Sequence, residues 1–269
     1  MHDFLGIHWD FSKTGQASLS MEGYINDIFT KYNVTKSCTT PATDQLFHTT
    51  PDSPPLTLEK KEMFRSYLAK RVRPQVLTAI SYCATRVISP TVEDEKKLDR
   101  ILSYLLFSRD DKFILRIGDH LQLNAYVDSS FGIYNDGKSV TGVAIMLGKA
   151  TIYIKSGKQK IVTRSSTESE LVGISDALSQ VLWTREYLIA AGLDVGPAMI
   201  YQDNQSTIWL ANKGRSTSER SRHIMSRSDI SLYHITSSYL PTGDMVADVL
   251  TKSLHGQLFV KLTGLLTGN

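Results

Sequence analysis

The residues Asn124-Ala125-Tyr126-Val127-Asp128, followed by Ser129-Ser130-Phe131-Gly132, set the architecture of this chain. Ala125 and Val127 alternate with Tyr126 and Asp128, which is the period-two pattern of a β-strand whose two faces differ. The strand ends in an acid, and an aspartate at this position is most often a turn residue. A functional role for Asp128 therefore depends on what the rest of the chain supplies.

Around this strand, the pattern predicts an antiparallel meander followed by alternating helices and strands. The expected strands are 113–117, 121–128, 140–147, 151–155 and 198–202, and the expected helices are 167–191, 204–213, 242–250 and 257–266. Residues 214–239 are poorly patterned. This order predicts an α/β fold with a mixed sheet, an antiparallel meander plus parallel strands, and helices on both faces.

The preceding part of the chain is expected to be mainly helical. A hairpin over 5–19 and a helix over 22–32 lead into 35–58, which is rich in Thr, Pro and Ser and is interpreted as an extended linker. Further helices are expected over 58–71, 75–87 and 91–106. Thr91 and Asp94 have the spacing of a capping box, with Asp in the place of Glu or Gln.

The composition is that of an ordinary globular protein, with 269 residues, of which 41% are hydrophobic and 21% charged. This length corresponds to one large or two ordinary domains. A formal net charge of +3 allows an anionic partner without requiring one. Cys38 and Cys83 match no zinc or disulfide spacing, which favours a reducing intracellular compartment. No stretch approaches the roughly 20 apolar residues of a membrane helix, so no membrane partner is expected.

Two acids open the long helix predicted at 167–191. Ser166 or Thr167 is the expected N-cap, and Thr167 with Glu170 has capping-box spacing, so Glu168 and Glu170 both have an ordinary interpretation. Glu170, however, shares the apolar stripe of residues 174, 178 and 181, and an acid packed against a sheet needs a partner or a metal. Glu168 lies roughly 200° around the helix and points away.

Two further acids stand at the ends of later elements. Asp203 follows the strand 198–202, where it is either a helix N-cap or a ligand-binding residue at the carboxyl end of a strand. Asp248 lies in the middle of the expected helix 242–250, flanked by Ala247 and Val249, although its ordinary role would be surface solubility.

Each of these acids is a weak signal alone, but together they suggest a metal centre. Clustered carboxylates raise each other's pKa, and divalent cations with a preference for oxygen ligands, such as Mg²⁺ or Mn²⁺, remove that cost. Two such ions roughly 4 Å apart suit phosphodiester hydrolysis. The sequence contains no Ser-His-Asp or Cys-His arrangement, no zinc-type cluster and no Walker A or dinucleotide fingerprint that would compete.

Seven segments closely resemble, in order and spacing, the ribonuclease H domain of copia-type retrotransposon polyproteins. They are Val127-Asp128-Ser129-Ser130-Phe131-Gly132, Lys138-Ser139-Val140-Thr141-Gly142, Lys158-Gln159-Lys160, Ser165-Ser166-Thr167-Glu168-Ser169-Glu170-Leu171, Tyr201-Gln202-Asp203-Asn204-Gln205-Ser206, Arg222-His223-Ile224 and Leu240-Pro241-Thr242-Gly243-Asp244-Met245-Val246-Ala247-Asp248-Val249-Leu250-Thr251-Lys252. The resemblance implies that Asp128, Glu170, Asp203 and Asp248 bind two magnesium ions, with manganese as the alternative. It also implies hydrolysis of the RNA strand of RNA–DNA hybrids.

Residues 1–111 resemble the region just upstream in the same polyprotein. Phe4-Leu5-Gly6-Ile7 and Gly23-Tyr24-Ile25 are similar to the end of the reverse transcriptase palm and the start of its thumb, and 73–106 is similar to the helical connection. The expected division is therefore 1–111, a reverse transcriptase remnant, and 112–269, a ribonuclease H-like domain. This implies a piece of a longer polyprotein, with the upstream palm and fingers as partners, in a cytoplasmic virus-like particle or the nucleus.

The resemblance also favours contacts between this domain and the nucleic acid backbone. Lys155, Lys158 and Lys160 are expected in a short basic turn that is either a solvated surface or a phosphate contact. The polar residues expected at helix N-termini, as donors to phosphate or to a 2′-hydroxyl, are Ser165, Ser166, Asn204 and Gln205. His223 receives no catalytic role.

Two alternatives to an active ribonuclease H stay open. The first is a decayed or non-catalytic module with the same fold, because 225–239 is shorter than in the family and must still supply the last sheet strand before Asp248. The second is an integrase-type nuclease, against which the fourth acid argues. Magnesium-dependent cleavage of a labelled hybrid separates these hypotheses.

Overall fold

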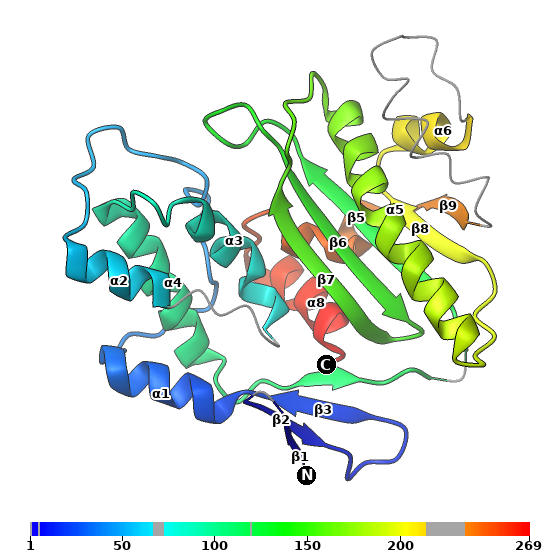
Figure 1. The fold of residues 1–269 in the computed structure, drawn as a ribbon, viewed down its shortest axis with the longest axis horizontal. Helices are drawn as coiled ribbons and strands as arrows, with labels where there is room; N and C mark the ends of the chain where they lie inside the picture. The colour runs from blue at the N-terminus through cyan, green and yellow to red at the C-terminus, as the bar shows by residue number, and fades with distance from the viewer. Residues whose placement is uncertain (1, 5, 67–72, 119, 214–234) are drawn as a thin grey trace.

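The computed structural model describes residues 2–4, 6–66, 73–118, 120–213 and 235–269 (Figure 1). His223, with the Arg222-His223-Ile224 segment, and the predicted residues 67–71 of the second helix lie outside this range.

A five-stranded mixed sheet forms the centre of the second part of the chain, in the order β7-β6-β5-β8-β9. Its strands are β5 (Leu123–Ser130), β6 (Val140–Leu147), β7 (Ala150–Lys158), β8 (Ala198–Gln202) and β9 (Ile235–Tyr239). The pairs β5–β6 and β6–β7 are antiparallel, whereas β5–β8 and β8–β9 are parallel. The predicted mixed sheet is confirmed, and the last strand forms despite the short segment before it.

Helices cover both faces of this sheet, as predicted (Figure 1). The long helix α5 (Ser166–Ala190) packs on one face, where Val127, Ile145 and Ile174 are fully buried, and α6 (Gln205–Lys213) lies beside it. The other face carries α8 (Gly256–Thr267) and two 3-10 turns, η3 (Thr242–Asp244) and η4 (Val246–Leu250). The predicted helix 242–250 is therefore wrong: Met245 is extended and divides it into two tight turns.

A four-stranded antiparallel sheet stands at the N-terminal end of the chain. It comprises β1 (His2–Phe4), β2 (Ile7–Asp10), β3 (Ala17–Ser20) and β4 (Phe113–Leu115). The predicted hairpin is thus a three-strand unit, and β4 pairs with β3 through Ala17 and Leu115. The prediction that 113–117 is the first strand of the meander is wrong. Its short apolar pattern fits either sheet, and its actual partner, β3, lies about 100 residues earlier in the sequence.

The helices of the first part follow the predicted pattern. They are α1 (Glu22–Tyr32), α2 (Leu58–Ser66), η1 (Pro74–Val76), α3 (Leu77–Thr85) and α4 (Val92–Phe107). The capping box of Thr91 and Asp94 is present, and Arg86 also pairs with Asp94. The described residues 33–57 form turns and extended chain, with an isolated bridge from Pro55 to Thr91.

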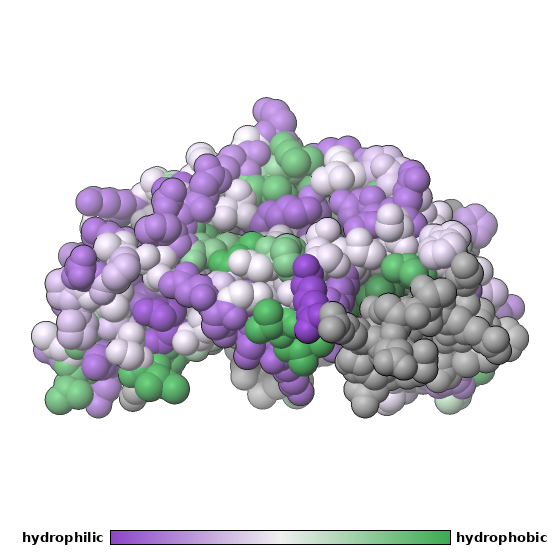
Figure 2. Space-filling view, turned by 90° about the horizontal axis from the view of Figure 1, so that it is seen from above, coloured by the Kyte–Doolittle hydropathy of each residue, from purple (hydrophilic) through white to green (hydrophobic). Residues whose placement is uncertain are grey.

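The helical part and the sheet share one hydrophobic core. The apolar side of α3 and α4 is continuous with residues on β6, η4 and α8, including Val140, Leu250 and Leu262. Thr78 on α3 donates to the carbonyl of Val249 at 2.7 Å, and Ser81 donates to the carbonyl of Ser156 at 2.9 Å. Seen from above, hydrophilic residues surround smaller apolar patches on the coloured surface (Figure 2).

Candidate metal centre

The strand β5 carries Asp128 to the point where it separates from its parallel neighbour. The last residue pair between β5 and β8 is Tyr126 with Tyr201, two residues before Asp128 and two before Asp203. Asp128 pairs across β6 with Gly142, and its side chain is 1% exposed on the face covered by η4. The Thr251 hydroxyl donates to its Oδ2. The predicted strand-end acid is thus buried rather than a surface turn residue.

Gly142 is what allows η4 to lie so close to Asp128. A Cβ at this position would stand 2.7 Å from Cγ2 of Thr251, 2.8 Å from Cβ of Leu250 and 2.9 Å from the carbonyl oxygen of Ala247. Real Cβ atoms almost never approach other atoms this closely. The glycine is therefore a packing requirement for the turn that carries Asp248.

The first turns of α5 present Glu170 toward the sheet. Ser165 caps the helix by accepting from the Glu168 amide at 3.1 Å, so the expectation of Ser166 or Thr167 as the cap is wrong by one residue or two. Glu168 turns back to accept from the Arg164 amide at 2.7 Å, away from the sheet as predicted. Glu170 is 5% exposed and shares the buried stripe of the helix.

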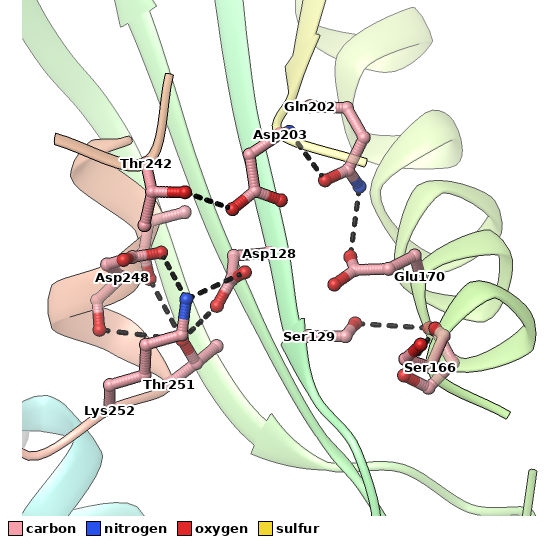
Figure 3. Close-up of polar contacts among 12 residues, drawn as sticks. Asp128, Ser129, Ser166, Glu170, Gln202, Asp203, Thr242, Asp248, Thr251 and Lys252 are labelled. Atoms are coloured by element: carbon pink, nitrogen blue, oxygen red, sulfur yellow. Dashed lines mark hydrogen bonds and ion pairs between the residues drawn. The ribbon is translucent and has the colours of Figure 1, made fainter. Parts of the chain in front are cut away.

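Asp203 follows β8 directly and is partly exposed. Its amide donates to Gln202 Oε1 at 2.9 Å, and the Thr242 hydroxyl donates to its Oδ2 at 3.0 Å. Asn204 caps α6 by accepting from the Thr207 amide at 3.2 Å. The N-cap role considered for Asp203 thus belongs to its neighbour, and the Asp203 carboxylate faces the other acids (Figure 3).

Three of the four predicted acids come together in one cluster. One carboxylate oxygen from each of Asp128, Glu170 and Asp203 lies within 4.8 Å of the other two. Asp128 lies within β5, which continues to Ser130, whereas Glu170 lies in the first turns of α5 and Asp203 directly follows β8 (Figure 3). Oxygen ligands at this spacing suit a magnesium or manganese ion.

Asp248 stands on the far side of Asp128 and joins the cluster through a lysine. It lies in η4, is 1% exposed, and accepts from Lys252 Nζ at 2.8 Å through its Oδ1. The same Nζ donates to Asp128 Oδ1 at 3.3 Å. The structure thus places the fourth acid beside the first, with an ammonium group between them (Figure 3).

The cluster therefore has two differently supported sides. The amide side comprises Glu170 and Asp203 with Gln202, whose Nε2 donates to Glu170 Oε2 at 2.9 Å. The ammonium side comprises Asp128 and Asp248 with Lys252. Sequence reasoning assigned no role to Gln202 or Lys252. Their positions could have drawn attention to them, because Gln202 directly precedes Asp203 and Lys252 follows Asp248 by four residues.

Burial shifts the acids toward their neutral forms. Desolvation and then the charge of Asp128 raise the pKa of Glu170 to about 9, although the Gln202 hydrogen bond works in the opposite direction. Desolvation and Asp128 also raise the pKa of Asp248 to about 7, against the influence of Lys252. Desolvation raises the pKa of Asp128 as well. Burial opposes the charge on Lys252, but the carboxylates of Asp128 and Asp248 outweigh it and raise the pKa of Lys252.

The three predicted basic residues do not form a turn. Lys155 and Lys158 belong to β7, and Lys160 is exposed just after it. Lys158 lies 2.8 Å from Asp136 and above the Tyr134 ring, and Lys155 lies 3.9 Å from Asp176. The expectation of a turn is wrong because the strand pairs with β6 as far as residue 158.

The polar residues predicted at helix N-termini are where the sequence placed them. Ser165 and Ser166 are exposed at the start of α5, and Gln205 is exposed as the first residue of α6. Asn204, at the cap of α6, is partly exposed. Among the described residues, no helix combines the length and the apolar character needed to cross a membrane.

Comparison with known proteins gives relatives along nearly the whole chain. The chain is 31% identical over 272 residues to the retrovirus-related Pol polyprotein from transposon RE1 of Arabidopsis thaliana, which covers 96% of the chain. A second Arabidopsis polyprotein, from transposon RE2, is 31% identical over 70% of the chain. The chain belongs to the retrovirus-related Pol family. It spans only 18% and 13% of the lengths of these two Pol proteins, and no family model matches its sequence.

Comparison with solved structures also gives similar chains. A foamy viral protease–reverse transcriptase in complex with double-stranded DNA covers 89% of the chain, with 15% identity and a TM-score of 0.50, and the chain covers 37% of it. The compost-derived LC11-RNase H1 covers 49% of the chain, with 15% identity and a TM-score of 0.40, and 93% of its own length is matched. The strand order and the helices on both faces agree with the mixed-sheet α/β fold that the sequence predicted.

Proposed function

We propose that this chain is the ribonuclease H part of a copia-type retrotransposon Pol polyprotein, and that it hydrolyses the RNA strand of RNA–DNA hybrids. The observation that carries the proposal is the meeting of Asp128, Glu170 and Asp203 within 4.8 Å, with Asp248 beside them. Acids this well buried are costly to keep together unless a cation binds them.

The donor set fits two magnesium ions, with manganese as the alternative, because every group is a hard oxygen ligand. Asp128, Glu170 and Asp203 would hold one ion, and Asp128 with Asp248 would hold the other. Bound ions of this kind supply an activated water and stabilise the departing oxygen of a phosphodiester.

Side chains of the protein hold the acids in place before any substrate arrives. Gln202 is fully buried and fixes the Glu170 carboxylate from behind, while Thr242 fixes Asp203. Thr251, also fully buried, fixes Asp128. Such partners orient metal-binding carboxylates, and their loss commonly lowers metal affinity or activity about 10- to 100-fold.

Residues near the cluster would bind the backbone of the hybrid. Lys155, Lys158 and Lys160 are assigned to phosphate contacts, which requires Lys158 to exchange Asp136 for a phosphate. Ser165, Ser166 and Gln205 expose polar groups at helix starts. Asn204 uses its side-chain oxygen for the cap, which leaves its amide nitrogen to donate to phosphate or a 2′-hydroxyl.

We also assign residues 1–111 to the end of a reverse transcriptase and residues 112–269 to the nuclease. The upstream palm and fingers of the same polyprotein would be the partners of this chain. Its place would be intracellular, in a virus-like particle or the nucleus, where reverse transcription supplies the hybrid.

The test is cleavage of an end-labelled RNA–DNA hybrid by the full chain with magnesium, with Asp203→Asn as the variant. Asp203 is partly exposed, so the isosteric change leaves the fold intact, which circular dichroism checks. We expect cuts in the RNA strand only, and their loss in the variant. Binding without cleavage would indicate a non-catalytic module, and cuts in duplex DNA an integrase-type nuclease. Full activity in the variant would reject the assigned site.

A further inference from the structure

An ammonium group occupies the space between two of the buried acids. Lys252 Nζ lies 2.8 Å from Asp248 Oδ1 and 3.3 Å from Asp128 Oδ1, so it touches the two oxygens that face each other. Both acids are 1% exposed, whereas the Lys252 side chain is 34% exposed. The lysine therefore reaches the acids from the surface and keeps a path back to solvent.

We propose that Lys252 is a resident counter-ion that must withdraw before a divalent cation can bind Asp128 and Asp248 together. The two ions of the proposed nuclease then bind with unequal affinity. The inference rests on the proposed function, since it concerns how the same centre takes up its metal.

The local backbone directs the lysine to this place. Lys252 follows Asp248 by four residues, and its amide donates to the Asp248 carbonyl at 2.9 Å, so both side chains leave the same turn. Thr251, the residue before Lys252, is fully buried, and its hydroxyl donates to Asp128. A flexible four-carbon stem then lets the ammonium stay between the acids or move outward without any change in η4.

The amide side of the cluster has no such cation among its described contacts. Glu170 accepts from the neutral amide of Gln202, and Asp203 accepts from the hydroxyl of Thr242. These partners orient the two side chains without placing a positive charge beside them. The first ion therefore binds Asp128, Glu170 and Asp203, whereas the second competes with Lys252.

Removing the ammonium should strengthen the weaker site. A positive charge a few ångströms from a cation opposes its binding, and the competing contacts vanish with it, so we expect the second ion to bind roughly tenfold tighter or more. The change Lys252→Met keeps the length of the stem and removes the charge.

The first experiment is calorimetric titration of the full chain with Mn²⁺, comparing wild type, Lys252→Met and Lys261→Met. Lys261 is a matched control, because it forms an ion pair with Asp244 at 2.6 Å outside the acid cluster. We expect one tight and one weaker site in wild type and Lys261→Met, and two sites of similar affinity in Lys252→Met. Unchanged or weaker binding of the second ion in Lys252→Met overturns the inference.

A second measurement follows the wild-type chain and uses the charge-conserving variant Lys252→Arg only to assign one signal. The Lys252 ammonium is held by two buried acids, so its side-chain ¹⁵N signal should be visible in wild type and absent from Lys252→Arg. We expect this signal to disappear as Mg²⁺ fills the second site. A signal that persists at saturating Mg²⁺ would overturn the inference.

The two proposals fail in different ways. If wild type binds no Mn²⁺ and cuts no hybrid, the proposed function fails and this inference with it. If wild type binds two ions and cuts the hybrid, but Lys252→Met does not change the second affinity, the inference alone fails.

Discussion

The amide side and the ammonium side of the acid cluster keep their carboxylates together in different ways. Both must keep carboxylates close together in a buried place. On the amide side, Gln202 and Thr242 orient Glu170 and Asp203 through neutral hydrogen bonds. On the ammonium side, Lys252 neutralises Asp128 and Asp248 directly. Different groups thus orient the carboxylates and compensate their charge. Among the described contacts, only the amide side holds its acids without a cation of the protein's own.

The largest effect is expected from Asp128→Asn, because Asp128 alone touches both sides. The amide cannot supply the charge that two cations need, so cleavage should fall by more than the roughly 100-fold seen when only a supporting residue is lost. The measurement is the single-turnover rate on a labelled hybrid. A loss no larger than that of Gln202→Leu would contradict the shared role of Asp128.

A smaller effect is expected from Gln202→Leu, which leaves the Glu170 carboxylate without its buried donor. Activity or affinity for the first Mn²⁺ should fall about 10- to 100-fold, while the second site is less affected. Gln180→Leu is the matched control, since Gln180 hydrogen-bonds only to Thr184 among the described contacts, on α5. Equal losses in the two variants would argue against a positioning role for Gln202.

Substitutions at two glycines should displace the two sides of the cluster separately, because each glycine packs closely against one side. A Cβ on Gly142 would press against η4, and a Cβ on Gly173 would stand 2.7 Å from the Ser129 hydroxyl, under α5. Overpacking of this kind costs about 1–3 kcal/mol, which melting temperatures would measure. Gly142→Ala should weaken mainly the second Mn²⁺ and Gly173→Ala mainly the first. The same pattern of metal affinities in both variants would mean that the sides are not independent.

The smallest effect is a pH dependence of stability in the absence of metal. Burial raises the pKa of Asp248 to about 7 and that of Glu170 to about 9, so the folded state favours their protonated forms. Stability is then greatest below their ordinary pKa values near 4 and falls as pH rises through 7 and 9. Melting in chelator between pH 6 and 9 should show this decline, and saturating Mg²⁺ should reduce it. Melting that rises with pH in chelator would contradict the sign.

Much of this centre could be predicted from local pattern. Alternation in β5 and the apolar stripe of α5 located Asp128 and Glu170, because both elements obey simple periodicities. The bridging role of Lys252 could not be predicted, because it requires Asp128 and Asp248, 120 residues apart, to face each other. The partner of β4 could not be predicted for the same reason, because the pattern of a three-residue apolar strand does not indicate which strand it pairs with.

The same limit applies to the 3-10 geometry of η4. The pattern of Val246-Ala247-Asp248-Val249-Leu250 does not distinguish a 3-10 turn from an α-helical one, and in the structure this turn lies close to Gly142 of β6. Helix propensity is a weak preference that tertiary packing overrides.

The core shared by α3, α4 and the mixed sheet has a consequence for how the two parts of the chain are connected. Thr78 donates to the carbonyl of Val249, and Ser81 donates to the carbonyl of Ser156, so hydrogen bonds as well as apolar packing join 1–111 to 112–269. A chain trimmed to begin at residue 112 would expose to water the apolar residues of β6, η4 and α8 that α3 and α4 now cover. Within the described residues, the mixed sheet and these helices are therefore held together by packing and not by a flexible tether.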